Sequence, residues 1–201
     1  MLKVGVLASG RGSNLEALLK QCANKKIAAQ VVVVISDKAE AKALAKADEY
    51  NVPAFFIDPK VYSSKTEYNR ALISKLKNFK VDLVVLAGYM RILDPLFIEA
   101  FPGKVINIHP SLLPAFPGLN AQGQALTGGV KYSGCTVHFV DEGMDTGPII
   151  AQAVVPVLPE DTVEVLAQRI LAEEHILLPK VVNWIAQGRV KLKGRQVVIN
   201  I

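Results

Sequence analysis

Cysteine is scarce in this 201-residue sequence, which contains only Cys22 and Cys135, far apart along the chain. Two cysteines do not make the dense disulfide framework of a small secreted domain, so we expect reduced thiols and a cytoplasmic location. Histidine occurs three times, and His109, His138 and His175 do not stand at metal-ligand spacing with one another or with the cysteines. The sequence therefore predicts no metal site.

The sequence also lacks a long hydrophobic run and a strong excess of one charge. No stretch approaches the ~18 apolar residues of a membrane span, and the apolar N-terminal stretch is too short for a signal peptide and runs into Gly10 and Arg11. The net charge is +5, and the basic residues are scattered rather than gathered in one stripe. We expect no membrane or nucleic-acid partner, but a soluble monomer or weak homodimer that binds small molecules.

Apolar runs typical of buried strands alternate with segments of helical periodicity in the first half of the chain. The expected strands cover 4–8, 31–35, 54–57, 83–87 and 105–108, and the expected helices cover 14–22, 39–50 and 63–79. This alternation predicts an α/β fold with a doubly wound, mostly parallel sheet and right-handed crossovers.

The pattern changes after about residue 110. Pro114 and Pro117 exclude regular structure from 112–118. The sequence then predicts an antiparallel strand pair, a long amphipathic helix with a kink or break at Pro179, and a last strand. The strand pair covers 135–140 and 149–157, the helix covers 162–186, and the last strand covers 197–199.

The densest basic run lies near the C-terminus. Lysine and arginine alternate with apolar residues from Arg189 to Arg195, which is typical of the solvent-exposed face of a strand. No linker or internal repeat divides the sequence. We therefore expect a single domain over 1–201, with a parallel half at 1–110 that carries a phosphate site and a half at 111–201 with the antiparallel strands and the long helix.

A glycine-rich turn, Gly10–Asn14, follows the first expected strand. Ligands of open parallel sheets bind beyond the carboxyl ends of strands, where a helix N-terminus favours a phosphate. Arg11 adds a cation, and the glycines let the backbone approach a ligand closely. Leu15 stands where a dinucleotide fingerprint has its third glycine, although Asp37 is placed to bind a ribose. A dinucleotide-binding oxidoreductase, a non-catalytic nucleotide-binding module and a turn without ligand therefore stay open as alternatives.

Asn107 and His109 stand two positions apart at the end of the fifth expected strand, so their side chains point to one face. An amide beside an imidazole suits acyl transfer, because the amide can hold a developing oxyanion while the imidazole moves a proton. Asp145, in a later turn, joins them only if that turn folds back onto His109. His138 alternates with apolar neighbours along a strand, and we interpret it as structural.

Four motifs follow one another: Gly-Arg-Gly-Ser-Asn-Leu from Gly10, Leu-Ala-Gly-Tyr-Met-Arg-Ile-Leu at 86–93, Asn-Ile-His-Pro-Ser-Leu-Leu-Pro at 107–114 and Met-Asp-Thr-Gly-Pro at 144–148. With them the whole chain resembles the phosphoribosylglycinamide formyltransferases, folate-dependent enzymes of purine biosynthesis with a Rossmann-like fold. The third motif alone marks the wider superfamily, so another folate formyltransferase or a deformylase is the alternative. The first motif, suited to a ribose 5-phosphate, favours the purine enzyme.

The resemblance implies roles for three groups of residues. The phosphoribosylglycinamide site would comprise Gly12, Ser13, Asn14, Leu171, Ala172, Glu173 and Glu174. The site for the formyl donor, 10-formyltetrahydrofolate, would comprise Lys65, Met90, Arg91, Ile92, Leu93, Asn107, Asp141, Glu142, Gly143, Met144 and Asp145. Asn107, His109 and Asp145 would be catalytic, with no metal. Asn120 and Gln122 depart from the family, which often has a histidine at the start of that helix.

In the implied reaction, the amine of phosphoribosylglycinamide attacks the formyl carbon and the formyl oxygen becomes negative. Asn107 and the imidazolium of His109 would donate hydrogen bonds to that oxygen. Asp145 would favour the charged imidazole and orient it or a relaying water.

Overall fold

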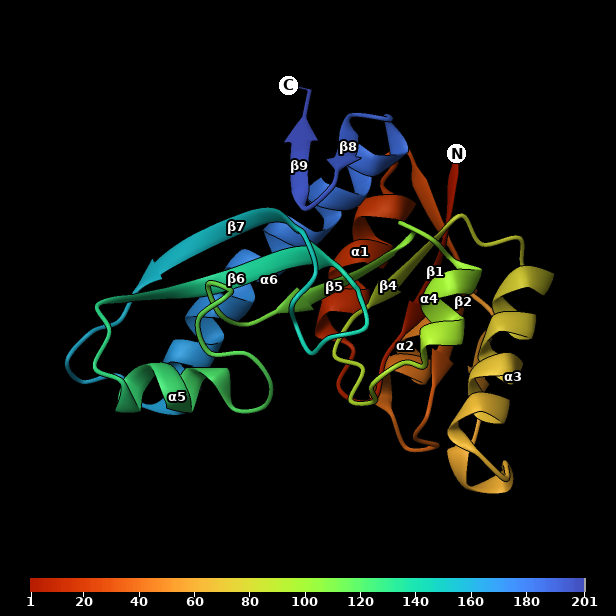
Figure 1. Ribbon diagram of the computed structural model, residues 1–201, viewed down its shortest axis with the longest axis horizontal. Coiled ribbons are helices and arrows are strands. Elements are labelled where there is room, and N and C mark those ends of the chain that lie inside the picture. The colour runs from red at the N-terminus through yellow and green to blue at the C-terminus, as the bar shows by residue number, and fades with distance from the viewer. Residues whose placement is uncertain (201) are drawn as a thin grey trace.

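The computed structural model describes residues 1–200. Seven strands form a central sheet in the order β3-β2-β1-β4-β5-β6-β7 (Figure 1). They are β1 (Leu2–Leu7), β2 (Ala29–Ser36), β3 (Ala54–Phe56), β4 (Leu83–Leu86), β5 (Val105–His109), β6 (Tyr132–Phe139) and β7 (Ile149–Pro156). The first five are parallel, β6 is antiparallel to β5, and β7 is antiparallel to β6. The predicted doubly wound sheet with an antiparallel pair is confirmed.

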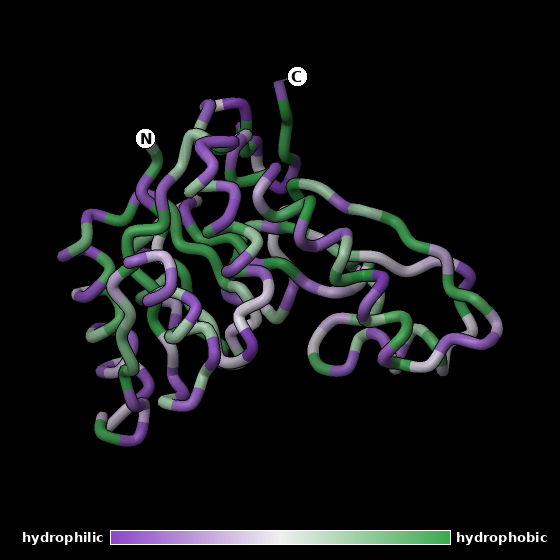
Figure 2. Tube along the Cα trace, turned by 180° about the vertical axis from the view of Figure 1, so that it is seen from behind, coloured by the Kyte–Doolittle hydropathy of each residue, from purple (hydrophilic) through white to green (hydrophobic). Residues whose placement is uncertain are grey.

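Helices cover both faces of this sheet. They are α1 (Ser13–Ala23), α2 (Lys42–Glu49), α3 (Lys65–Asn78), α4 (Pro95–Ala100), α5 (Ala121–Thr127) and α6 (Val163–Ala186), with a short 3-10 helix, η1 (Pro59–Val61), before α3. Side chains of β4 alternate between the faces: Leu83 and Val85 pack with α1, α2 and α6, whereas Val84 and Leu86 pack with α3 and α4. Figure 2 shows the hydrophobic strands running through the interior and hydrophilic residues along the outer turns.

A kink or break was expected at Pro179, and the break is wrong, because the long helix α6 runs uninterrupted from Val163 to Ala186. Pro179 has no N–H to donate to the carbonyl oxygen of His175. Its neighbours Leu178 and Val182 are fully buried in the core, and this apolar packing offsets the missing hydrogen bond. Neither α6 nor any other helix in residues 1–200 is long and apolar enough to cross a membrane.

Two other helices differ from expectation. The helix expected from residue 39 begins at Lys42, because Ala41 before it is extended, with φ −63° and ψ 118°. Helix α4 was not expected at all, since six residues are too few to show a period. Local chemistry starts it: the Asp94 carboxylate accepts a hydrogen bond from the Leu96 N–H at 3.0 Å, and Pro95 occupies the first turn.

The chain ends in a hairpin of β8 (Val190–Lys193) and β9 (Gln196–Ile199), which form a separate two-stranded sheet. The expected last strand is present, and the exposed Lys191 and Lys193 confirm the solvent-exposed face predicted for the basic run. The hairpin does not join the main sheet, but β9 lies against β7 (Figure 1).

Candidate active site

Strands β1, β4 and β5 are neighbours in the middle of the sheet, and their carboxyl ends lie side by side. Strand β1 leads into the glycine-rich turn, and β4 leads into residues 88–93. The Ser9 N–H donates a hydrogen bond to the Gly88 carbonyl at 3.0 Å, and the Met90 N–H donates to Ser9 Oγ at 2.9 Å. These contacts join two of the predicted site segments where an open parallel sheet binds its ligands.

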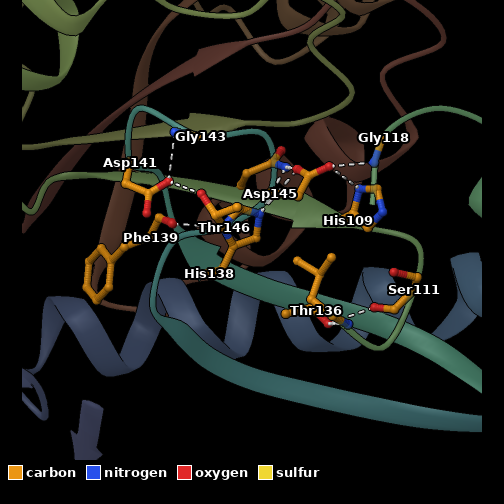
Figure 3. A network of polar contacts seen from close by, with 12 residues as sticks. His109, Ser111, Gly118, Thr136, His138, Phe139, Asp141, Gly143, Asp145 and Thr146 are labelled. Atoms are coloured by element: carbon orange, nitrogen blue, oxygen red, sulfur yellow. Dashed lines mark hydrogen bonds and ion pairs between the residues drawn. The ribbon is translucent and has the colours of Figure 1, made fainter. Parts of the chain in front are cut away.

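Asp145 is the centre of a polar cluster at the end of β5 (Figure 3). Its Oδ2 lies 3.3 Å from His109 Nδ1, and its Oδ1 accepts a hydrogen bond from Asn107 Nδ2 at 3.3 Å. Asn107 and His109 lie on β5, while Asp145 lies in the loop between β6 and β7. The loop does fold back onto His109, so the three residues predicted to act together are in contact.

Backbone groups hold this cluster in place. His109 Nε2 donates a hydrogen bond to the Phe116 carbonyl at 2.9 Å, and the Gly118 N–H donates to Asp145 Oδ2 at 2.9 Å. Because Nε2 is already a donor, the Nδ1 contact with the carboxylate is satisfied when Nδ1 also carries a proton. The geometry therefore suits an imidazolium paired with a carboxylate.

The carboxyl group of Asp145 is only 13% exposed. Burial alone would raise its pKa, but hydrogen bonds from His138 and the Gly118 N–H, with the charges of His109 and His138, hold the pKa below its ordinary value. Asp145 is thus ionised near neutral pH, which is the form that pairs with an imidazolium.

His138 belongs to the same cluster, although the sequence suggested only a structural role. It lies on β6 directly opposite Asn107. Its buried ring donates from Nδ1 to the Phe139 carbonyl at 2.8 Å, and its Nε2 lies 3.3 Å from Asn107 Nδ2 and 3.6 Å from Asp145 Oδ1. His138 therefore helps to orient both side chains. Only the register of β5 against β6, which periodicity does not reveal, could have indicated this.

The loop that carries Asp145 is closed by its own side chains and by the C-terminal hairpin. Asp141 Oδ1 accepts hydrogen bonds from the Gly143 N–H at 3.1 Å and from Thr146 Oγ1 at 2.6 Å. Arg195, in the β8–β9 turn, donates to the Thr146 carbonyl at 2.6 Å and lies 3.9 Å from Asp141 Oδ2. Glu142, Gly143 and Met144 are exposed at the tip. Sequence reasoning missed Arg195, which looked like one more exposed basic residue.

The glycine-rich turn directly precedes α1, as predicted. Gly12 has φ +70°, a conformation that favours glycine, and Ser13 is the first residue of α1. A Cβ on Gly12 would lie 2.7 Å from Ala43 Cα and 2.9 Å from Ala43 Cβ. The structure therefore adds a second reason for glycine, which is the close approach of α2.

We expect Gly12→Val to lower the free energy of unfolding by about 2 kcal/mol or more, because it combines the left-handed backbone with a clash against α2. Gly10→Ala is the matched control, since a Cβ there meets nothing within 4 Å, and its effect should stay below about 1 kcal/mol. Urea unfolding of both variants measures the difference. Equal stability of the two variants would contradict this account of Gly12.

Asn14 and Glu174 connect α1 with α6 beneath the glycine-rich turn. Asn14 Nδ2 donates a hydrogen bond to Glu174 Oε2 at 2.6 Å, and both side chains are buried. Burial raises the pKa of the Glu174 carboxyl, against the hydrogen bond from Asn14 and the charge of Arg11. Of the predicted residues 171–174, only Glu174 makes a side-chain hydrogen bond to this turn in the described part of the chain, and Ala172 is exposed.

A surface cavity of about 410 Å³ lies beside residues 88–93. Its lining comprises Lys65, Tyr68, Asn69, Tyr89, Met90, Arg91, Ile92 and Leu93. The side chains of Met90 and Ile92 are 64% and 59% exposed, so its rim is apolar. The cavity unites five of the predicted donor-binding residues, including Lys65, whereas Asn107 and the 141–145 loop do not line it.

The remaining sequence predictions concern helix α5 and metals. Asn120 precedes α5 with φ +56° and no capping hydrogen bond, and neither Asn120 nor Gln122 makes a side-chain hydrogen bond to Asp145 or the histidines among residues 1–200. Within the same residues, no group of three or more His, Cys, Asp or Glu side chains is arranged to hold a metal ion.

Comparison with known proteins covers nearly the whole chain. Residues 2–182 match the family described as formyl transferase. A phosphoribosylglycinamide formyltransferase of Bacillus subtilis is 46% identical over 183 residues, which are 91% of this chain and 94% of the relative. The glycinamide ribonucleotide transformylase 1 structure from Symbiobacterium toebii has 53% identity and a TM-score of 0.99, covering 100% of this chain and 95% of the other.

A longer relative contains the same region as one part of a larger protein. The trifunctional purine biosynthetic protein adenosine-3 of Gallus gallus is 46% identical over 191 residues, or 95% of this chain but only 19% of the relative. The residues matched by the family model include all seven strands of the central sheet and the polar cluster at the end of β5. The chain belongs to the formyl transferase family.

Proposed function

We propose that this protein transfers the formyl group of 10-formyltetrahydrofolate to the amine of phosphoribosylglycinamide, a step of purine biosynthesis. The observation that carries the proposal is the contact of Asn107, His109 and Asp145 at the end of β5, in a chain similar to named phosphoribosylglycinamide formyltransferases over nearly its full length. An amide, an imidazole and a carboxylate in contact form a proton-transfer and oxyanion site.

The two substrates bind at separate sites along the carboxyl ends of the parallel strands. The glycine-rich turn at the start of α1 offers the phosphate of phosphoribosylglycinamide backbone donors and the Arg11 charge. The cavity beside residues 88–93 offers the formyl donor aromatic and apolar walls, and its volume is within the usual range for a small-molecule site. The polar cluster lies at the end of β5, the strand next to β4.

Each catalytic side chain has a distinct part in the proposed reaction. The amine nitrogen forms a bond to the formyl carbon, and Asn107 donates a hydrogen bond to the oxygen that becomes negative. The bond between the formyl carbon and the folate nitrogen then breaks, the amine loses a proton and the folate nitrogen gains one. His109 Nε2 is bonded to a backbone carbonyl, so protons move through its Nδ1, beside Asp145.

We treat residues 1–201 as one formyltransferase domain, in which 1–110 binds the phosphate and 111–201 supplies the folate loop, because α6 of the second part packs against α1 of the first. We place the enzyme in the cytoplasm as a monomer or weak homodimer. Its two cysteines are free, which suits a reducing compartment, and analytical ultracentrifugation tests the oligomeric state.

Formyl transfer in a purified system tests the function. The chain is incubated with 10-formyltetrahydrofolate and phosphoribosylglycinamide, and the formylated product is measured, with water and methionyl-tRNA as competing acceptors. We expect product with phosphoribosylglycinamide and little with the others, whereas equal release to water would indicate a deformylase. Thermal shifts with NAD serve as the control for a dinucleotide site, since a ligand at ~100 times its Kd stabilises by about 2.7 kcal/mol.

Within this function, Glu174→Ala is expected to raise the KM for phosphoribosylglycinamide about 10-fold or more and to leave the KM for the formyl donor unchanged. The substitution removes a buried carboxylate and leaves the Asn14 amide without its partner. Initial-rate measurements with each substrate varied in turn give both constants. Glu164→Ala, exposed at the start of the same helix, is the matched control. A rise in both KM values would indicate a general disturbance of the fold instead.

A further inference from the structure

Asp37 is a buried carboxylate beside the site that the proposed reaction leaves without a role. It directly follows β2, and β1 separates it from β4 and residues 88–93 in the sheet order. Its side chain is only 2% exposed. Arg91 supplies the nearby positive charge, with Nη1 at 3.9 Å from Asp37 Oδ2. This contact spans the end of β1.

The contacts of Asp37 give no reason to expect that its burial stabilises the fold. Its Oδ1 is buried and has no hydrogen-bond partner among residues 1–200. A buried carboxylate with an incomplete set of partners is unfavourable for folding, and an apolar or neutral residue often stabilises such a position. A buried polar group without a partner calls for another explanation, and the Arg91 guanidinium, 3.9 Å from the other carboxylate oxygen of Asp37, is the charge that this carboxylate faces.

Arg91 is held between Asp37 and an aromatic pair. Its guanidinium carbon lies 5.5 Å from the centre of the Tyr68 ring, and the Tyr68 hydroxyl is 2.7 Å from the Tyr89 hydroxyl. Both tyrosines and Arg91 line the cavity beside residues 88–93. The Arg91 side chain is 44% exposed, so packing alone does not hold it. The contact with Asp37 and the contact with the Tyr68 ring are the two charge interactions that the Arg91 guanidinium makes in the described part of the chain.

We infer that Asp37 is a positioning residue that fixes Arg91, and through Arg91 the wall of the cavity for the formyl donor. The inference rests on the proposed function, since it assigns the cavity to a reduced folate. Without the carboxylate, the long Arg91 side chain is free to extend into solvent. The formyl donor must then order the Arg91 side chain when it binds. Asp37 thus lowers the entropic penalty of binding without touching the donor.

The test is a double-mutant cycle with tetrahydrofolate as the probe. Calorimetric Kd values are measured for the wild-type chain, Asp37→Asn, Arg91→Gln and the double variant. We expect each single substitution to weaken binding about 10-fold and the double variant to bind no more weakly than Arg91→Gln. Glu40→Gln, an exposed acid three positions away, is the matched control and should bind normally.

The melting temperature distinguishes a residue that positions Arg91 from a residue that only stabilises the fold. If Asp37 positions Arg91, Asp37→Asn should leave Tm unchanged or raise it, because it removes a poorly partnered buried charge. Asp37→Ser is the second variant if the asparagine does not fold. A lower Tm with normal binding, or additive losses in the cycle, would overturn the inference alone. Failure of the wild-type chain to bind tetrahydrofolate would contradict the proposed function, and the inference with it.

Discussion

Replacing His109 with alanine should lower kcat by about 10²–10⁴-fold, the range for a positioned acid or base. The KM values should change little, because neither the glycine-rich turn nor the cavity beside residues 88–93 includes this ring. The physical reason is the environment of the imidazole: it is 5% exposed, one nitrogen donates to a carbonyl, and the other faces the Asp145 carboxylate. Alanine at position 109 removes the only ring nitrogen that the described residues place 3.3 Å from Asp145 Oδ2.

Asp145→Asn separates the charge from the shape. We expect it to lower kcat as well, because the amide no longer stabilises an imidazolium at His109. If Asp145 acts through the imidazole, the double variant is little slower than His109→Ala, and single-turnover rates measure this. Asp48→Asn, exposed on α2, is the control. Additive losses would show that Asp145 acts independently of His109.

Asn107→Ala should lower kcat by about 10²–10³-fold, the loss typical of one oxyanion donor. Both KM values should stay nearly constant, since the charge that Asn107 meets develops only in the transition state. Single-turnover rates and equilibrium binding distinguish chemistry from affinity. Asn78→Ala, at the exposed end of α3, is the matched control.

The competing outcome for Asn107 is weaker binding with normal turnover. That result would make Asn107 a substrate-binding residue and leave the oxyanion to another donor. His138 is relevant here, because its ring lies 3.3 Å from the Asn107 amide. His138→Gln should therefore reproduce part of the Asn107→Ala loss if the orientation of the amide matters.

The sheet was predictable because its signals are local. Strand β4 is apolar at every position, as expected of a strand covered on both faces. Ser64 caps α3 by accepting a hydrogen bond from the Glu67 N–H, and serine is a common residue at this position. The continuity of α6 was not predictable, since the packing that compensates for Pro179 comes from distant residues. Six-residue α4 gives no periodic signal, so its only sequence signal is the Asp94-Pro95 pair at its start.

The site was predictable only in part. The shared face of Asn107 and His109 follows from their spacing on a strand, whereas their contact with Asp145 needed the family resemblance. The contacts of His138 with Asn107 and Asp145 were not predicted, because strand alternation looks the same for a residue that only packs and for one that faces this pair. The Asp37–Arg91 contact depends on how two loops cross β1, and neither residue shows this in its own neighbourhood.

The hydrogen bond between Asn14 and Glu174 joins residues 160 positions apart. Contacts of such high sequence separation slow the folding of a domain. All seven strands of the central sheet precede α6 along the chain, so Glu174 is synthesised long after the turn that it contacts. A ligand that binds the glycine-rich turn only when Glu174 is in place therefore stabilises chains in which α6 is docked onto α1.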